Sequence, residues 1–430
     1  MLTQHAATDD DDDDGCASDG DHLTDSARLL QVEFNTISCG AGSLCNRVAD
    51  MHRFLIDRYV QSPAEPQIRQ PVNEVITNLA AAMAHAHRLF LEQRVDPSAA
   101  PSSTVVLFVV QKREANMSDQ RQIEYALWEK HRVPVRRITL DEVEAEAQLD
   151  ERTGHLWLPV QGGSAPAPFL PVSSAAAAVP APARQLVSVI YFRAGYTPRD
   201  FTSAHGAEWT ALERMERSVA IKCPSIAYHL SGTKKVQQVL TAPDVLERFL
   251  PGEDAAAIQQ RNDIRAVFAG MWRPDAEIVA RALAHPGQFV LKPQREGGGN
   301  NLWGSAMVAE LQSKSLQELQ IYVLMERIGG PHCATPAAVL KAGVVHMLTH
   351  TVSELGMMGC VITDVAAAAA AEEESSGPAA SVSVAAPAAP VSSVFHRNSF
   401  AGYLLRTKEE ALTEGGLMAG SGAIDSIVLI

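Results

Sequence analysis

Apolar runs and polar breaks alternate along most of the chain, and this pattern predicts alternating strands and helices. Residues 105–110 are continuously apolar, as expected of a strand that is buried on both faces. Before them, apolar residues recur at three- and four-residue spacing over 72–90, which predicts an amphipathic helix that ends near Pro97. A helix pattern over 120–130 and a strand pattern over 133–140 follow, so this part of the chain predicts a parallel βαβ layer.

Shorter connections join the apolar runs of the C-terminal half. The runs over 289–291, 322–325 and 344–352 have connections of this kind, which favour an antiparallel or mixed sheet. We therefore expect an α/β fold with more than one sheet.

Two low-complexity segments, 165–183 and 366–393, consist mostly of Ala, Pro and Ser or Glu. Each lies between two strand-like runs, the first between 156–160 and 186–192 and the second between 357–363 and 393–405. Doubling the length of a loop costs only about 0.6 kcal/mol, so hairpin tips tolerate such insertions. We expect flexible insertions at the tips of two hairpins.

The net charge of −14 is unevenly distributed along the 430 residues. Residues 1–30 hold nine Asp and one Arg, so the other 400 residues carry a net charge of only −6. Adjacent Asp side chains repel one another, and we expect residues 1–29 to form a disordered acidic tail. An acidic chain does not favour a nucleic-acid partner, and the lack of a charge-free apolar run of about 18 residues argues against a membrane span.

The six cysteines show no Cys-x-x-Cys spacing, so a structural zinc site has no support. The N-terminus has no apolar stretch like that of a signal peptide. These features predict buried free thiols in a cytoplasmic protein.

The first candidate functional residues lie in 31–38, which the pattern predicts to be a strand. Side chains two apart on a strand share a face, so Glu33 and Asn35 would point the same way, about 7 Å apart. A carboxylate and an amide oxygen are ligands that Mg²⁺ prefers. An ordinary strand with one polar face is the alternative.

A second and more distinctive group follows the predicted strand 289–291. Lys292, Arg295 and Glu296 precede three consecutive glycines at 297–299. The N–H groups of glycine can approach phosphates closely, and Glu296 adds another oxygen for Mg²⁺. The segment is not a Walker loop, because no Gly-Lys-Ser/Thr opens a following helix. A plain Gly-rich turn is the alternative.

Two basic groups complete the candidates. Arg406 and Lys408 precede a Gly-rich stretch at 414–420 and could bind a carboxylate or a phosphate. Lys234 and Lys235 lie at the predicted start of a helix, where positive charge is unfavourable unless an anion is near. Charges placed on an ordinary surface are the alternative.

Taken together, these residues resemble the eukaryotic-type glutathione synthetases, a family of ATP-grasp ligases. The run Lys-Pro-Gln-Arg-Glu-Gly-Gly-Gly-Asn-Asn at 292–301 is highly specific to that family. The resemblance extends in family order from residue 31 almost to the C-terminus. The other matching segments are 31–38, 108–111 with Glu114, Asn116 and Gln120, 191–196, 222–224, 232–238, 325–328, 353–356 and 404–408 with 415–416.

The resemblance implies an α/β architecture of ATP-grasp type, with mixed or antiparallel sheets, a Gly-rich lid and an inserted parallel-sheet layer that binds substrate. It implies a homodimer that uses ATP and Mg²⁺ to join γ-glutamylcysteine to glycine. In that reaction ATP phosphorylates the cysteinyl carboxylate, the glycine amine attacks the acyl phosphate, and phosphate leaves.

The resemblance also implies a role for individual residues. Mg²⁺ would be held by Glu33, Asn35 and Glu296, and the catalytic residues would be Arg406, Lys292 and Gly298. The residues that would bind ATP are Lys234, Lys292, Gln294, Gly297, Gly298, Gly299, Asn300, Asn301, Trp303, Met325, Glu326, Arg327, Ile328, Glu354, Lys408 and Glu414. Those that would bind the peptide substrate are Ser38, Glu114, Asn116, Gln120, Arg193, Tyr196, Arg406, Leu417 and Met418.

Four domain segments follow from the resemblance. They are the acidic tail over 1–29, the N-terminal part of the ATP-grasp body over 30–100, a substrate-binding α/β domain over 101–233, and a catalytic and lid region over 234–430. The low-complexity insertions, here delimited as 161–185 and 365–393, interrupt the last two.

The chain departs from the family pattern at four places. The Asp-rich tail stands where family members carry an upstream region that includes an Arg in contact with substrate. Gly40 replaces a second Ser, Trp303 replaces a Tyr, and Leu417-Met418 replace smaller residues near the glycine end. Two alternatives therefore stay open: a related ligase with another acceptor such as β-alanine, and a truncated, non-catalytic nucleotide-binding paralogue.

Overall fold

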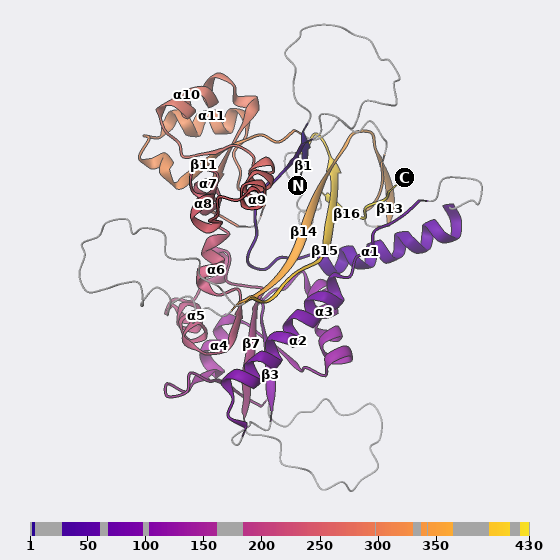
Figure 1. Cartoon of the computed structure of the whole chain (residues 1–430), viewed down its shortest axis with the longest axis vertical. Helices are drawn as coiled ribbons and strands as arrows, with labels where there is room; N and C mark the ends of the chain where they lie inside the picture. The colour runs from indigo at the N-terminus through magenta and orange to yellow at the C-terminus, as the bar shows by residue number, and fades with distance from the viewer. Residues whose placement is uncertain are drawn as a thin grey trace. The chain divides into compact units, whose positions relative to one another are not determined.

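The chain forms two compact units in the computed structural model (Figure 1). The first unit contains Met1–Asn35, Leu44–Asn73 and Ser231–Ile430, and the second contains Thr36–Ser43 and Glu74–Leu230. The structure describes residues 2–4, 28–60, 68–97, 103–160, 184–296, 298–329, 337–341, 343–363, 395–412 and 422–429.

The second unit is built on a mixed sheet of six strands in the order β4-β3-β7-β6-β5, with β8 also paired to β7. The central strand β7 pairs in parallel with β3 and β8, and β3 pairs in parallel with β4, whereas β5 and β6 are antiparallel additions. The strands are β3 (Thr104–Val109), β4 (Val135–Ile138), β5 (Gln148–Leu149), β6 (Leu156–Pro159), β7 (Arg184–Phe192) and β8 (Ile221–Cys223).

Helices cover both faces of this sheet, because its central strands are apolar on both faces. Alternate residues of β3, including Val105, Leu107 and Val109, pack with Val143 of α4 and Met215 of α5 in one buried cluster. Figure 1 shows α2 and α3 on the other side of β3 and β7. The helices are α2 (Val75–Arg94), α3 (Met117–His131), α4 (Leu140–Glu146), α5 (Ala207–Arg217) and α6 (Ile226–Ser231), with a 3-10 turn at Pro198–Asp200.

The first unit contains a three-stranded antiparallel sheet, ordered β10-β11-β9, with helices beside it. Leu291 and Leu324 face a cluster with α10 and α11, and Val290 and Val323 face a second cluster that includes Leu30. The elements are α7 (Lys234–Leu240), α8 (Leu246–Phe249), α9 (Ala255–Ala266), β9 (Met271–Trp272), α10 (Ala276–Ala284), β10 (Phe289–Pro293), α11 (Gly304–Ser313) and β11 (Tyr322–Glu326), with 3-10 turns at Pro286–Gln288 and Glu318–Ile321.

A long antiparallel hairpin forms a second sheet of this unit, ordered β14-β15-β16. The buried Cys45 of α1 docks onto it: the Leu405 N–H donates to the thiol sulfur at 3.5 Å, and the thiol donates to the Asp425 carbonyl at 3.3 Å. The remaining elements are β1 (Leu2–Gln4), β2 (Arg28–Leu30), α1 (Gly42–Leu55), a π-helical turn at Ile56–Val60, β12 (Ala337–Lys341), β13 (Val344–Leu348), β14 (Thr351–Thr363), β15 (Phe395–Glu409) and β16 (Gly422–Asp425).

Several predictions from the apolar pattern are confirmed. The parallel β3-α3-β4 arrangement and the long helix α2 are present. Both low-complexity segments join antiparallel neighbours, since Pro159 pairs with Arg184 and Thr363 pairs with Phe395. The inserted residues themselves lie outside the described part of the chain.

Other predictions are corrected. The strand expected over 344–352 is two strands, β13 and β14, separated by a bend at residues 349–350. Buried thiols are confirmed for Cys45 and Cys360, but Cys39 and Cys223 are exposed. Of the predicted acidic tail, Leu2–Gln4 pairs with Arg28–Leu30, and residues 5–27 lie outside the described part.

Two further observations bear on the predicted organisation. Helix α2 packs on α3 and β7 of the second unit, whereas the sequence grouped residues 30–100 with the other body. Among the described helices, none is both long and apolar enough to cross a membrane.

His87 gives this fold a testable dependence on pH. Ser188 donates its hydroxyl proton to the Val105 carbonyl, so the ring Nδ1 of His87 must donate to Ser188 Oγ at 2.7 Å. Burial, and secondarily the charge of Arg88, lowers the pKa of His87 below its ordinary value. Folding therefore favours the neutral ring, and as the pH falls below about 6.5 the unfolded chain takes up this proton before the folded chain does.

We expect the free energy of unfolding to fall as pH is lowered from 6.5 towards 5, by at most about 1.4 kcal/mol per pH unit for this histidine. The measurement is urea unfolding at a series of pH values, with His87→Asn, whose amide keeps a donor, and the exposed His205→Asn as the matched control. A pH slope that His87→Asn leaves unchanged would contradict the assignment.

Candidate functional site

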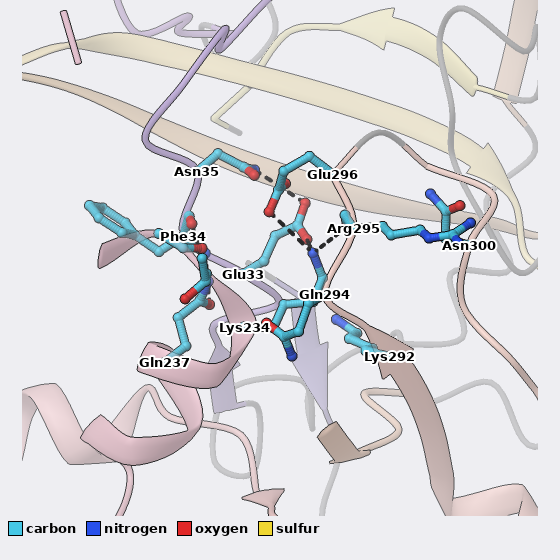
Figure 2. A network of polar contacts seen from close by, with 12 residues as sticks. Glu33, Phe34, Asn35, Lys234, Gln237, Lys292, Gln294, Arg295, Glu296 and Asn300 are labelled. Carbon is cyan, nitrogen blue, oxygen red and sulfur yellow. Dashed lines mark hydrogen bonds and ion pairs between the residues drawn. The ribbon is translucent and has the colours of Figure 1, made fainter. Parts of the chain in front are cut away.

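A lysine–carboxylate cluster, defined as Glu33, Asn35, Lys234, Lys292 and Glu296, lies in the first unit (Figure 2). Lys234 is the first residue of α7, whose N-cap Thr233 accepts the Val236 N–H. Lys292 is on β10, and Glu296 is in the loop that follows it. The structure therefore brings together residues that the sequence places more than 200 positions apart.

The segment 31–38 is not the strand that its pattern predicts. Only Gln31 makes a ladder bridge, to Phe268, and the following backbone groups bond to side chains. The amide of Gln237 accepts from the Phe34 N–H at 2.9 Å and donates to the Phe34 carbonyl at 3.2 Å. Lys292 Nζ donates to the Val32 carbonyl at 3.2 Å. The side chains of Gln237 and Lys292 thus make hydrogen bonds to the backbone that a neighbouring strand would otherwise make.

Lys234 is the centre of the cluster. Its ammonium lies 3.8 Å from Glu33 Oε2 and 3.5 Å from Glu296 Oε1, and it donates to the Arg295 carbonyl at 2.9 Å. Its side chain is only 7% exposed. The anion expected beside the helix start is thus supplied by the protein's own carboxylates.

The two carboxylates differ in their tendency to ionise. Burial alone would raise the pKa of Glu33, but the charges of Lys234, Lys292 and Arg406 and a hydrogen bond from Asn35 hold it below its ordinary value. Burial raises the pKa of Glu296, and the nearby charge of Glu33 adds to the rise against the opposing charge of Lys234. Glu33 is therefore the more firmly ionised member of the pair.

The residues predicted to hold Mg²⁺ fit a hard cation. Glu33 and Glu296 converge on one ammonium, and Asn35 Nδ2 donates to Glu33 Oε1 at 3.1 Å, so all three lie together. Two carboxylates and an amide are oxygen donors of the kind that Mg²⁺ takes.

The predicted nucleotide residues form a loop and an apolar wall beside this cluster. Gly299 has a φ of +87°, a conformation that favours glycine, and Asn300 Nδ2 donates to the Gly298 carbonyl at 3.5 Å. Trp303 and Ile328 pack against the buried cluster that contains Met325.

The backbone and side-chain contacts of the neighbouring residues fix this wall. The Lys235 N–H donates to Gln294 Oε1 at 3.0 Å, and Glu326 Oε2 accepts from the Gly270 N–H at 3.0 Å. The Arg327 N–H donates to the Gln288 carbonyl at 2.7 Å. Asn301 precedes Leu302, which bridges to Leu291.

A pair of cations lies on β15. Arg406 Nη2 donates to Glu354 Oε2 at 2.7 Å, and Lys408 Nζ lies 3.5 Å from Glu354 Oε1. Arg406 is among the charges that act on Glu33, so this pair belongs to the electrostatic surroundings of the first cluster. Four predicted residues lie outside the described part of the chain: Gly297, Glu414, Leu417 and Met418.

A second cluster, centred on Arg193, lies in the second unit. The guanidinium Nη1 donates to the Cys39 carbonyl at 2.8 Å and to the Tyr191 hydroxyl at 3.1 Å, and it lies 3.4 Å from Asp119 Oδ2. Burial would lower the pKa of Arg193, but Tyr191 and Asp119 raise it. Burial raises the pKa of Tyr191 to about 12.

The other predicted peptide-binding residues surround Arg193. Glu114 Oε1 accepts from the Asn116 N–H at 2.8 Å, and Gln120 is buried next to Asp119. Ser38 Oγ donates to the Phe192 carbonyl at 3.2 Å. Tyr196 Oη accepts from Gln111 at 3.3 Å, and burial, with Asp200, raises its pKa.

Sequence reasoning missed three residues that fix the two clusters. Asp119 and Tyr191 hold Arg193, and Gln237 holds the segment that carries Glu33. Two of these residues could have been found from their positions in the sequence. Asp119 lies one helical turn after Asn116, and Tyr191, on a strand, lies two residues before Arg193.

Comparison with known proteins gives consistent matches. The model of the family described as eukaryotic glutathione synthase, ATP binding domain, matches residues 15–429. The chloroplastic glutathione synthetase of Solanum lycopersicum is 36% identical over 406 residues, 94% of this chain and 61% of that protein. The glutathione synthetase of Homo sapiens is 32% identical over 407 residues, 93% of this chain and 70% of that protein.

The chain thus spans 61% of the length of the first of these relatives and 62% of that of the chloroplastic glutathione synthetase of Arabidopsis thaliana. A solved structure, a glutathione synthetase-like effector of Globodera pallida in its apo form, matches with a TM-score of 0.59 at 19% identity, over 92% of this chain and 70% of that one. This likeness concerns the fold alone.

Gly40 provides a test of the second cluster. A Cβ atom at this position would lie 2.8 Å from Arg193 Nη2 and 2.8 Å from Asn116 Nδ2, and Arg193 is held on three sides. We expect Gly40→Ala and Gly40→Ser to lower the free energy of unfolding by about 1–3 kcal/mol through overpacking, measured by urea unfolding.

Gly287→Ala is the matched control, because a Cβ there meets nothing within 4 Å. The crowding argument is wrong if Gly40→Ala and Gly287→Ala unfold at the same urea concentration.

Proposed function

The chain belongs to the eukaryotic glutathione synthase family, and on that premise we propose that it is an ATP-dependent ligase that joins γ-glutamylcysteine to glycine. The products would be glutathione, ADP and phosphate, formed through an acyl phosphate on the cysteinyl carboxylate. The observation that carries the proposal is the buried Lys234 ammonium between Glu33 and Glu296, with Lys292 nearby.

This arrangement suits phosphoryl transfer, because the reaction needs fixed cations along the phosphates and carboxylates that hold a metal ion. Lys234 and Lys292 would contact phosphate oxygens, and the glycines at 298–299 would bring backbone N–H groups to them. Glu33, Asn35 and Glu296 would hold Mg²⁺, which when bound neutralises phosphate charge. Trp303 and Ile328, which pack on the buried Met325, would receive the nucleotide base.

The architecture supports the same proposal. The antiparallel sheet β10-β11-β9 with its helices, and the hairpin β14-β15 that carries Arg406, would form an ATP-grasp body. The Gly-rich loop after β10 would act as the lid that excludes water from the acyl phosphate. Arg406, oriented by Glu354, would stabilise the charge on that intermediate.

The proposal includes a cytoplasmic homodimer, and sedimentation equilibrium and a fluorescent fusion would test these two statements. The Leu417-Met418 substitution motivates the related proposal of a different acceptor. Rates with glycine and with β-alanine decide between the two acceptors. ATP binding without ligation of either would favour the non-catalytic alternative.

We expect Glu296→Gln to reduce Mg²⁺-dependent glutathione formation by about 100-fold or more, because it removes a charged metal ligand and a partner of Lys234. The exposed Glu253→Gln is the matched control, and the measurement is the initial rate of glutathione and ADP formation over a range of Mg²⁺ concentrations. Equal rates for Glu296→Gln and the wild type would show that the metal assignment is wrong.

A further inference from the structure

The second cluster contains buried polar atoms that its own contacts do not satisfy. Among the described residues, Glu114 Oε2, Gln120 Nε2, Arg137 Nη1 and Arg193 Nε are buried without a hydrogen-bond partner. Protein interiors pair nearly all such atoms. The charges of Glu114 and Arg193 both act on Arg137, so these groups lie near one another. One acceptor and several donors left together indicate a ligand that carries both a cation and an anion.

Arg137 of β4 sets the direction of the Gln120 amide. Its Nη2 lies 2.6 Å from Gln120 Oε1, and its side chain is 11% exposed. A guanidinium only donates hydrogen bonds, so the amide oxygen of Gln120 must face Arg137. The Nε2 group of Gln120 is consequently turned away as a donor that lacks a protein partner.

When the charged residues of this cluster are paired with one another, the cation Arg137 and the anion Glu114 remain without a partner of opposite charge in the described part of the chain. Arg121 Nη1 donates to both carboxylate oxygens of Glu124, at 2.6 and 2.8 Å, and Arg193 forms an ion pair with Asp119 at 3.4 Å. Among the described residues, the carboxylate nearest to Arg137 is Glu124, at 3.8 Å, and Arg121 already neutralises it, so Arg137 has no carboxylate of its own. Burial, and then the charge of Arg121, lowers the pKa of Arg137. A bound anion would relieve both effects.

We propose that Arg137 recognises the α-carboxylate of the γ-glutamyl group, through its own Nη1 and by turning Gln120 Nε2 towards it, while Glu114 receives the α-ammonium. The proposal deepens the function proposed above and rests on it. It adds to the site a residue that the family resemblance does not assign.

The adjacent Arg136 differs from Arg137 in that both of its Nη atoms have protein partners, although its Nε is buried without a partner among the described residues. Its side chain lies on the other face of β4, where its Nη atoms donate to the Pro159 carbonyl and to Glu146. Arg136 and Arg137 therefore form a matched pair for mutagenesis, with one residue on each face of the sheet.

The test compares three substrates at saturating ATP and glycine. They are γ-glutamylcysteine, 4-aminobutanoyl-cysteine, which lacks the α-carboxylate, and glutaryl-cysteine, which lacks the α-ammonium. We expect the wild type to disfavour each analogue by about 100-fold in kcat/KM, because each leaves a buried charged group unpaired.

In Arg137→Met the penalty for the missing carboxylate should shrink to about threefold, while the penalty for the missing ammonium stays as in the wild type. Arg137→Lys should restore part of the discrimination, and KM for ATP should stay within about twofold of the wild type. Gln120→Glu should weaken the binding of γ-glutamylcysteine at least as much as Arg137→Met does, because an ionised carboxylate has no proton to donate. Arg136→Met is the control that should keep both penalties.

Two outcomes would overturn the inference. Arg137→Met could keep the carboxylate penalty, as Arg136→Met should, or it could lose both penalties equally. If the wild type ligates none of the substrates, the proposed function fails. In that case calorimetric titration of the same three compounds into wild type and Arg137→Met decides the inference by their dissociation constants.

Discussion

The Lys234 ammonium between Glu33 and Glu296 is the contact on which the first cluster depends. Two carboxylates that close together repel each other strongly, and a cation between them reverses the sign of that interaction. The same lysine donates to the Arg295 carbonyl, so the charge balance and the path of the glycine loop are set by a single side chain. Two further cations act on the same cluster. Lys292 donates a hydrogen bond to the segment that carries Glu33, and Arg406 of β15 adds positive charge near Glu33.

The sequence predicts best where a single periodicity determines burial. Strand β3 is apolar after Thr104 and helix α2 has a regular apolar face, so both could be located from the pattern alone. The segment 31–35 could not, because its backbone bonds to Gln237, a partner about 200 residues away. The members of the first cluster were named from their motif, and their convergence on Lys234 needed the tertiary fold. Likewise, no pattern identifies Asp119 and Tyr191 as the groups that hold Arg193.

The structure gives a physical reason for one departure from the family pattern, the glycine at position 40. In the sequence it is a lost hydroxyl, whereas in the structure it is a place where a Cβ would lie 2.8 Å from the ends of the Arg193 and Asn116 side chains, so that these side chains would have to shift. The absent side chain is thus tied to the position of a buried guanidinium. Arg137 and Gln120 extend the same lesson, because a hydrogen bond that looks structural decides which atom of an amide remains for a ligand.

In the hairpin of β14 and β15, the proposed functional residue Arg406 lies far from the end at which the hairpin closes. Arg406 pairs with Glu354, and the hairpin closes where Thr363 pairs with Phe395, nine residues further along β14. At about 3.3 Å per residue, that distance is roughly 30 Å of hydrogen-bonded ladder. Sequence can therefore be gained or lost at the far end without passing through the part that holds Arg406. In evolutionary terms, the hairpin is a position where the gene can accumulate new coding sequence while selection on the site continues undisturbed.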